Sequence, residues 1–224
     1  YTYELAVILR EGLRRMLEEH ESVFYYVTVM NEAYRQPPMP QGVEESILKG
    51  MYHLRTLKGE GPVVRLLGAG TILREVEAAG DILNESHGLT VEIFSVTSFT
   101  QLNRNGDDVA RWNLLHPEET PRESHARFLL PGDAPVVVAS DYMKSLAEPL
   151  RGQIDADLHV LGTDGFGRSD TRERLRHFFE VDRNFVTLAA LKVLADQQKL
   201  PVEVVARTRD ELGIDPEKAN PRLV

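Results

Sequence analysis

The chain has 224 residues, of which 42% are hydrophobic and 27% charged, the composition of a soluble globular protein long enough to bury a substantial core. It has no cysteine, which excludes disulfides, thiolate metal sites and cysteine nucleophiles, and no run of about 18 apolar residues that could cross a membrane. The net charge is −9 and no basic patch is visible, so we expect neither nucleic acid nor a membrane among its partners. The absence of cysteine suits a reducing compartment, and we expect a cytoplasmic protein. Because Tyr1 is neither an initiator Met nor the start of a signal sequence, we expect a piece of a longer protein.

The first predicted unit is a helix followed by a buried strand. Leu5, Leu9 and Leu13 recur at helical spacing among charged residues, which predicts an amphipathic helix over residues 3–19. Residues 23–29, VFYYVTV, are apolar on both alternating faces, as in a strand buried within a parallel sheet. Because one helix and one strand cannot make a core, we expect this pair to complete a domain whose other strands precede it.

Three prolines separate this unit from the rest of the chain. Pro37, Pro38 and Pro40 prevent regular strand pairing and favour an extended connector. We therefore expect the end of one domain at residues 1–34, a proline-rich linker at residues 35–62 with a short helix at residues 43–52, and a second domain at residues 63–224.

The second domain shows alternating strand and helix patterns. Strands are predicted at residues 63–67, 89–96, 135–140 and 158–162. Helices are predicted at residues 71–86, 142–152, 171–179, 183–198 and 201–212, and residues 99–130 form an irregular helical insertion. This order predicts the α/β class, with a doubly wound, mostly parallel sheet. The insertion is either a lid or an interaction surface, and we favour interaction.

A Gly68-Ala69-Gly70 sequence joins the first of these strands to its helix, where backbone N–H groups could hold a phosphate. Leu73 stands where a dinucleotide-binding motif needs its third glycine, and Glu92 lies within a strand rather than at its end. A tight strand-to-helix turn is therefore the preferred interpretation.

Ser169 follows Gly167 as in the nucleophile elbow of a hydrolase, but Thr171 stands where the elbow needs a second glycine. No spacing pairs Ser169 with His159 or His177 as a base, and a helix cap is the better use of the serine.

His116 and His125 flank several glutamates, which could suggest a metal site. Their spacing fits no known ligand pattern, so we favour a solvated acidic loop.

Two clusters remain as candidate functional residues. Asn31 and Glu32 follow the carboxyl end of the strand at residues 23–29, where open α/β sheets bind their ligands, although a solvated loop is the alternative. In the second cluster two glycines bracket an aromatic residue, which forces the backbone into a tight path before a helix. We expect a structural turn or an interface there, formed by Asp164, Gly165, Phe166, Gly167 and Arg168. No catalytic residue and no metal ligand is assigned.

Four stretches of the sequence resemble one enzyme family. The stretch TVMNEAYRQPPMPQGVEESILKGMYHL is similar to the end of the pyrimidine-binding domain and the linker of the transketolase-like thiamine-diphosphate enzymes. The stretches SVTSFTQLNRNGDDVARWNLLHPEETPR, VVVASDYMKSLAEPLR and VLGTDGFGRSDTRERLRHFFEVD resemble the C-terminal domain of one branch, the homodimeric pyruvate dehydrogenases.

The resemblance implies a parent enzyme that decarboxylates pyruvate on thiamine diphosphate and Mg²⁺ and then acetylates a lipoyl group of dihydrolipoyl acetyltransferase. It also implies a homodimer, with the cofactor-holding signature upstream of Tyr1, so we expect this chain alone to hold no cofactor and to be inactive. Asn31 and Glu32 correspond to a Ser-Arg pair that grips sugar phosphate in transketolases, although Arg35 could take that place instead. Their position implies the edge of the substrate channel.

Two other functions remain open. The chain could act as an interaction module that binds the acyltransferase or a partner subunit. Transketolase activity is a weaker alternative, because Asn31 and Glu32 cannot pair bidentately with a phosphate.

Overall fold

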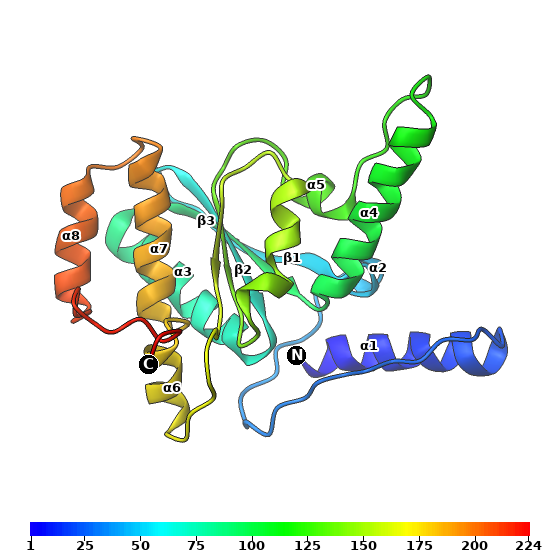
Figure 1. Ribbon diagram of the computed structural model, residues 1–224, viewed down its shortest axis with the longest axis horizontal. Coiled ribbons are helices and arrows are strands. Elements are labelled where there is room, and N and C mark those ends of the chain that lie inside the picture. The colour runs from blue at the N-terminus through cyan, green and yellow to red at the C-terminus, as the bar shows by residue number, and fades with distance from the viewer.

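The computed structural model describes residues 1–224 and contains one five-stranded sheet (Figure 1). In chain order the strands are β1 Met51–Leu57, β2 Val63–Ala69, β3 Thr90–Val96, β4 Val136–Ala139 and β5 Leu158–Leu161. Their order across the sheet is β1-β3-β2-β4-β5, and all neighbours are parallel except β1, which runs antiparallel to β3 at one edge. The predicted α/β class and mostly parallel sheet are confirmed.

Helices cover both faces of this sheet. Figure 1 shows α3, α7 and α8 on one side and α4 and α5 on the other. None of the helices combines the length and the apolar character that crossing a membrane requires. The helices are α1 Thr2–Leu13, continued by a π-helical turn at Arg14–Glu18, then α2 Glu44–Leu48, α3 Leu73–His87, α4 Phe99–Leu115, α5 His125–Leu129, α6 Arg172–Phe178, α7 Arg183–Asp196 and α8 Val202–Glu211.

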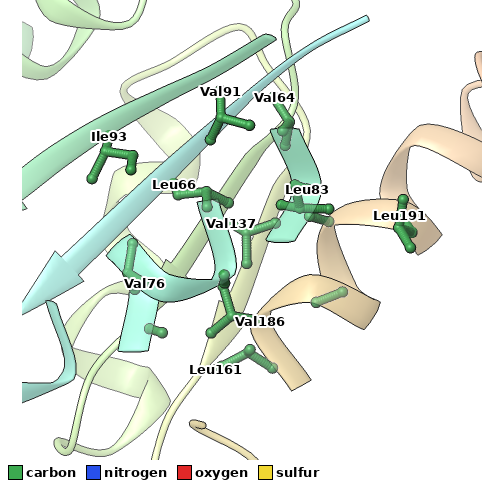
Figure 2. Close-up of a cluster of buried hydrophobic side chains, with 14 of the residues drawn as sticks. Val64, Leu66, Val76, Leu83, Val91, Ile93, Val137, Leu161, Val186 and Leu191 are labelled. Carbon is green, nitrogen blue, oxygen red and sulfur yellow. The ribbon is translucent and has the colours of Figure 1, made fainter. Parts of the chain in front are cut away.

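Alternate residues of the central strands point into two separate cores. Val64 and Leu66 of β2 pack with α3 and α7, together with Val91, Val137 and Val186 (Figure 2). The neighbouring residues of the same strands point to the opposite face, against α4 and α5. This is why the central strands are apolar at nearly every position, as strands covered on both faces must be.

Residues 23–29 do not form the predicted strand. They run back along α1 without a strand partner, and Tyr25 packs on Gly12, where an added Cβ would lie 3.3 Å from its ring. Phe24 and Tyr26 are 88% and 87% exposed. The physical reason is that backbone N–H and C=O groups form a ladder only when a neighbouring strand is present.

Two further predictions are corrected within the second half of the chain. Met51–Leu57, placed in the linker and partly in a helix, forms edge strand β1, so the sheet begins before residue 63. Residues 142–152, predicted as one helix, form two short 3₁₀ turns, Lys144–Leu146 and Glu148–Gly152. Pro149 lacks the N–H group that a continuous helix would need at this point.

Helix α4 projects from the body of the molecule (Figure 1). Near its end the Trp112 ring stacks on His116, 4.4 Å between centroids, and the Arg122 guanidinium lies 3.7 Å from the same ring. Leu114 and Leu115 are 78% and 53% exposed. The insertion is thus an ordered projection, and its assignment as an interaction surface stays a prediction.

Gly68, within β2, provides a test of the packing between β2 and α3. A Cβ added at Gly68 would lie 2.6 Å from the Cα of Leu73, a backbone atom that cannot move aside without shifting α3. We expect Gly68→Ala to lower the free energy of unfolding by about 1–3 kcal/mol in urea denaturation. Gly152→Ala, where a Cβ meets nothing within 4 Å, should leave it unchanged or raise it by up to about 1 kcal/mol. Equal stability of the two variants would contradict this packing.

Candidate functional site

The candidate site lies at the carboxyl edge of the sheet, where the strand order reverses between β2 and β4. Doubly wound folds bind their ligands at this switch point. Gly70 follows β2 with φ +56°, and a Cβ there would lie 3.7 Å from the carboxylate of Asp141, which follows β4. The two strand ends are therefore close together, and the space between them is narrow.

The carboxylate of Glu32 lies at this edge among three arginines. Its Oε1 accepts a hydrogen bond from Arg74 Nη1 at 2.8 Å, and its Oε2 accepts one from Arg176 Nη2 at 2.6 Å. Arg172 Nε is 3.8 Å from the same Oε2. Arg74 comes from the first turn of α3, whereas Arg172 and Arg176 are one helical turn apart on α6. The Glu32 side chain is only 16% exposed, so the segment before the prolines is held by buried charge.

A second carboxylate, Glu75, completes the network. Arg176 Nη1 lies 3.3 Å from Glu75 Oε1, so a single guanidinium joins Glu32 to Glu75. Glu75 Oε2 also accepts hydrogen bonds from the Arg183 side chain at 2.8 Å and from the Arg183 backbone N–H at 3.2 Å. The contacts run from Glu32 through Arg176 and Glu75 to Arg183. We call these four residues the ion-pair network.

The pKa values show that both carboxylates are charged at neutral pH. Burial by itself raises the pKa of Glu32, but the hydrogen bonds and charges of Arg176 and Arg74 outweigh it and leave the pKa below its ordinary value. Burial likewise raises the pKa of Glu75, and Arg183 and Arg176 together bring it below its ordinary value. Asp141 lies near Arg176 without a direct bond to it, and burial raises the pKa of its carboxyl group.

Asn31, the other predicted residue of this cluster, takes part in the same contacts. Its Oδ1 accepts a hydrogen bond from Arg172 Nη2 at 2.5 Å. Two other contacts hold its neighbours: the Thr28 and Tyr142 hydroxyls are hydrogen-bonded, and the Arg74 guanidinium lies 4.7 Å from the Tyr34 ring centroid. The structure therefore brings Asn31 and Glu32 to α3 and α6.

The second predicted cluster forms the loop between β5 and α6. Asp164 Oδ1 accepts a hydrogen bond from the Lys144 backbone N–H at 3.1 Å, and Gly165 has φ +103° and packs beside Pro221. Phe166 is 86% exposed, Gly167 has open space where a Cβ would stand, and the Arg168 guanidinium lies 4.5 Å from the Phe178 ring. The hydrogen bonds of Asn31 and Glu32 go to α3 and α6 and not to these five residues.

Sequence reasoning did not find Arg74, Glu75, Arg172, Arg176 and Arg183. Helix α3 is about one hundred residues away from α6 and α7 in the sequence, and only the fold brings the three helices together. The four-residue spacing of Arg172 and Arg176 is a signal that they share a helix face, but it does not identify their partner.

Three histidines considered as catalytic or metal-binding groups, His116, His125 and His177, contact other groups, and Thr171 rather than Ser169 caps α6. His177 Nδ1 contacts Asp182 Oδ2 at 3.0 Å, and no hydrogen bond joins Ser169 to a histidine. The buried His125 ring contacts the carbonyl oxygen of Met51 at 2.8 Å. No group of three His, Asp or Glu side chains is placed to hold a metal ion. Glu92, considered as a ribose ligand, pairs with Arg65 in the sheet at 2.8 Å.

Two small cavities lie near the network. One of about 310 Å³ is lined mainly by tyrosine, arginine and acidic side chains, including Tyr34, Arg55 and Arg74. The other, about 350 Å³, lies under the loop that contains Arg168. Both carboxylates of the network are paired with arginines, so its chemistry is that of positioning rather than proton transfer.

Glu75 makes the acid sensitivity of the network testable. The pKa of Glu75 is lowered on folding, so its contribution to stability is complete above its unfolded value of about 4.3 and is lost as the pH falls through the lower folded value. We expect Glu75→Gln to reduce the free energy of unfolding at pH 7 by about 2–4 kcal/mol, and the difference from the unmodified chain to shrink below about pH 4. Chemical denaturation at several pH values measures both effects.

Glu85→Gln is the matched control, because Glu85 is an exposed residue of the same helix without an ion pair. It should change stability by less than about 0.5 kcal/mol. A Glu75→Gln difference that stays constant down to pH 3 would contradict the ionised, paired state of Glu75.

Comparisons with known proteins show what this chain is similar to. The chain is 53% identical to "Pyruvate dehydrogenase E1 component" of Cupriavidus necator and 51% identical to that of Escherichia coli, each over 100% of this chain and 25% of the relative. It therefore spans about a quarter of the length of these curated relatives. Among solved structures it is similar to transketolase from Leishmania mexicana, with 18% identity, 82% of this chain and 21% of that chain covered, and a TM-score of 0.45.

Two family models match consecutive parts of the chain. Residues 1–37 match the pyruvate dehydrogenase E1 component middle domain, and residues 50–182 match the transketolase-like C-terminal domain. The first match ends within the proline-rich stretch, and the second begins just before β1. Because the second match covers more than half of the residues of this chain, the chain belongs to the transketolase-like C-terminal domain family.

Proposed function

We propose that this chain is the C-terminal part of a pyruvate dehydrogenase E1 component. In this proposal the whole protein is a cytoplasmic homodimer that decarboxylates pyruvate with thiamine diphosphate and Mg²⁺. It then transfers the acetyl group to a lipoyl group of dihydrolipoyl acetyltransferase. The proposal is supported by the identity of about one half to relatives that carry the E1 name, an identity that extends over the whole chain.

The residues of this chain do not fit thiamine diphosphate and its metal. Mg²⁺ is held by carboxylate and carbonyl oxygens together with phosphate, and no cluster of acidic side chains is placed for this role. The carboxylates at the switch point, Glu32 and Glu75, are already paired with arginines. We therefore assign the cofactor to the rest of the protein and derive no reaction step from the residues described here.

The contribution we assign to this chain is structural support for that active site. The observation that carries it is the segment at residues 23–30, which is apolar, largely exposed and nevertheless held at the sheet edge by Glu32. Residues 1–37 match the E1 middle domain, which supports the proposal that the rest of that domain supplies the missing strand partners. In this proposal residues 1–34 end the middle domain, the prolines form the connection, and the sheet domain supports them.

We further propose that Asn31 and Glu32 lie at the edge of the substrate channel. Three arginines approach Glu32, and the two of them that hydrogen-bond to it are occupied by its carboxylate rather than free to bind a substrate phosphate. Arg35, the other residue considered for this place, is exposed. Because Glu32 occupies these two arginines, they cannot grip a phosphate group bidentately, so a substrate without a phosphate, such as pyruvate, suits this edge better than a sugar phosphate.

The proposal is tested by activity measurements on the full-length enzyme and on this 224-residue chain. With pyruvate, thiamine diphosphate, Mg²⁺ and an artificial electron acceptor, the full-length protein should show saturable turnover, and this chain should show none. A full-length protein that uses ketose phosphates instead of pyruvate would contradict the assigned substrate. Turnover by the chain alone would contradict the assignment of the cofactor to upstream residues.

A further inference from the structure

The segment at residues 28–36 has no regular structure of its own, so its side-chain contacts determine where it lies. It has no helix or strand, and no backbone hydrogen bond joins it to the sheet. It is held instead by the contacts of Thr28, Asn31, Glu32 and Tyr34 described above, and by Gln36, whose Oε1 accepts from the Thr2 backbone N–H at 2.9 Å. Of these anchors, Glu32 makes the most ion pairs and is among the most buried.

Arg176 determines the position of Glu32 because Arg176 is itself held by Glu75 on the side away from Glu32. Its side chain is 13% exposed, and its two terminal nitrogens contact Glu32 and Glu75 separately. Glu75 is 9% exposed and is held by Arg183 through a backbone and a side-chain hydrogen bond. Since a guanidinium is a rigid planar fork, a fixed Glu75 determines where the other side of Arg176 can place a carboxylate.

We propose that Arg176, together with Arg172 and Glu75, is a positioning residue for substrate binding, which rests on the function proposed above. The three side chains touch no reacting atom. They fix Asn31 and Glu32 at the channel edge, and so they set the concentration of pyruvate at which the enzyme is half-saturated. The sheet domain therefore contributes to substrate affinity through an ion pair that crosses to the preceding segment.

The test is steady-state kinetics of Arg176→Gln in the full-length enzyme saturated with thiamine diphosphate and Mg²⁺. We expect the KM for pyruvate to rise about 5- to 20-fold while kcat changes by less than about threefold, because binding geometry changes and the reacting groups do not. Arg176→Lys should recover only part of the loss, because an ammonium keeps the charge but cannot serve both carboxylates through a planar fork.

The matched control is Arg65→Gln. Arg65 is 9% exposed and pairs with Glu92 at 2.8 Å between β2 and β3, so its loss also breaks a buried ion pair but one within the sheet. Arg65→Gln should lower the Tm by about as much as Arg176→Gln does, and it should leave the KM for pyruvate unchanged. A rise in KM that is equal in both variants would show a general loss of stability and would overturn the proposal.

Arg172→Gln keeps the proposal testable if Arg176→Gln does not fold. Arg172 is half-exposed and reaches Asn31 directly, so its replacement should raise the KM with little change in Tm. An unchanged KM for Arg172→Gln, or for a folded Arg176→Gln, would overturn the positioning role. Failure of the proposed function is a separate result, because it appears as a lack of pyruvate turnover in the unmodified full-length enzyme.

Discussion

The guanidinium of Arg176, shared between Glu32 and Glu75, is the interaction on which the arrangement of this chain depends. Placing two carboxylates and an arginine in a largely buried position costs desolvation energy, which only good geometry and further hydrogen bonds can offset. Here Arg74 and Arg183 supply those additional donors. The result is a fixed relative position of α3, α6 and the segment before the prolines. Apolar residues in place of these charged side chains would lack the directional contacts that specify this position.

A second acidic residue attaches the N-terminal helix to the same sheet. Glu4 of α1 is 9% exposed and accepts hydrogen bonds from the Tyr52 hydroxyl at 2.8 Å and the Ser95 hydroxyl at 2.5 Å. Tyr52 lies in β1 and Ser95 in β3, so α1 rests on the antiparallel edge of the sheet. Glu4 and Glu32 thus hold both ends of a segment whose central part, residues 23–29, has no strand partner. This explains how an exposed apolar stretch keeps a defined path.

Sequence patterns predicted those parts of the fold in which local signal and tertiary environment agree. The continuous apolar runs at β2, β3, β4 and β5 indicated strands covered on both faces. The prediction for residues 23–29 used the same signal and was wrong for the described chain, because an apolar run shows that a segment favours burial but not whether a partner strand is present to bury it. Strand β1 was missed although Tyr52, Leu54 and Thr56 alternate with more polar residues after Gly50, since the nearby prolines favoured a linker. The site was predictable only at Asn31 and Glu32, because their partners come from helices distant in the sequence.

The central claim, that Glu32 and Arg176 join the two parts of the chain, is tested most directly by a double-mutant cycle in the full-length protein. The cycle compares the unfolding free energies of Glu32→Gln, Arg176→Gln, the double variant and the unmodified protein. The ion-pair network predicts a coupling energy of about 1–3 kcal/mol between the two positions. Strictly additive effects, with a coupling energy near zero, would show that the two side chains do not hold each other and would contradict the account.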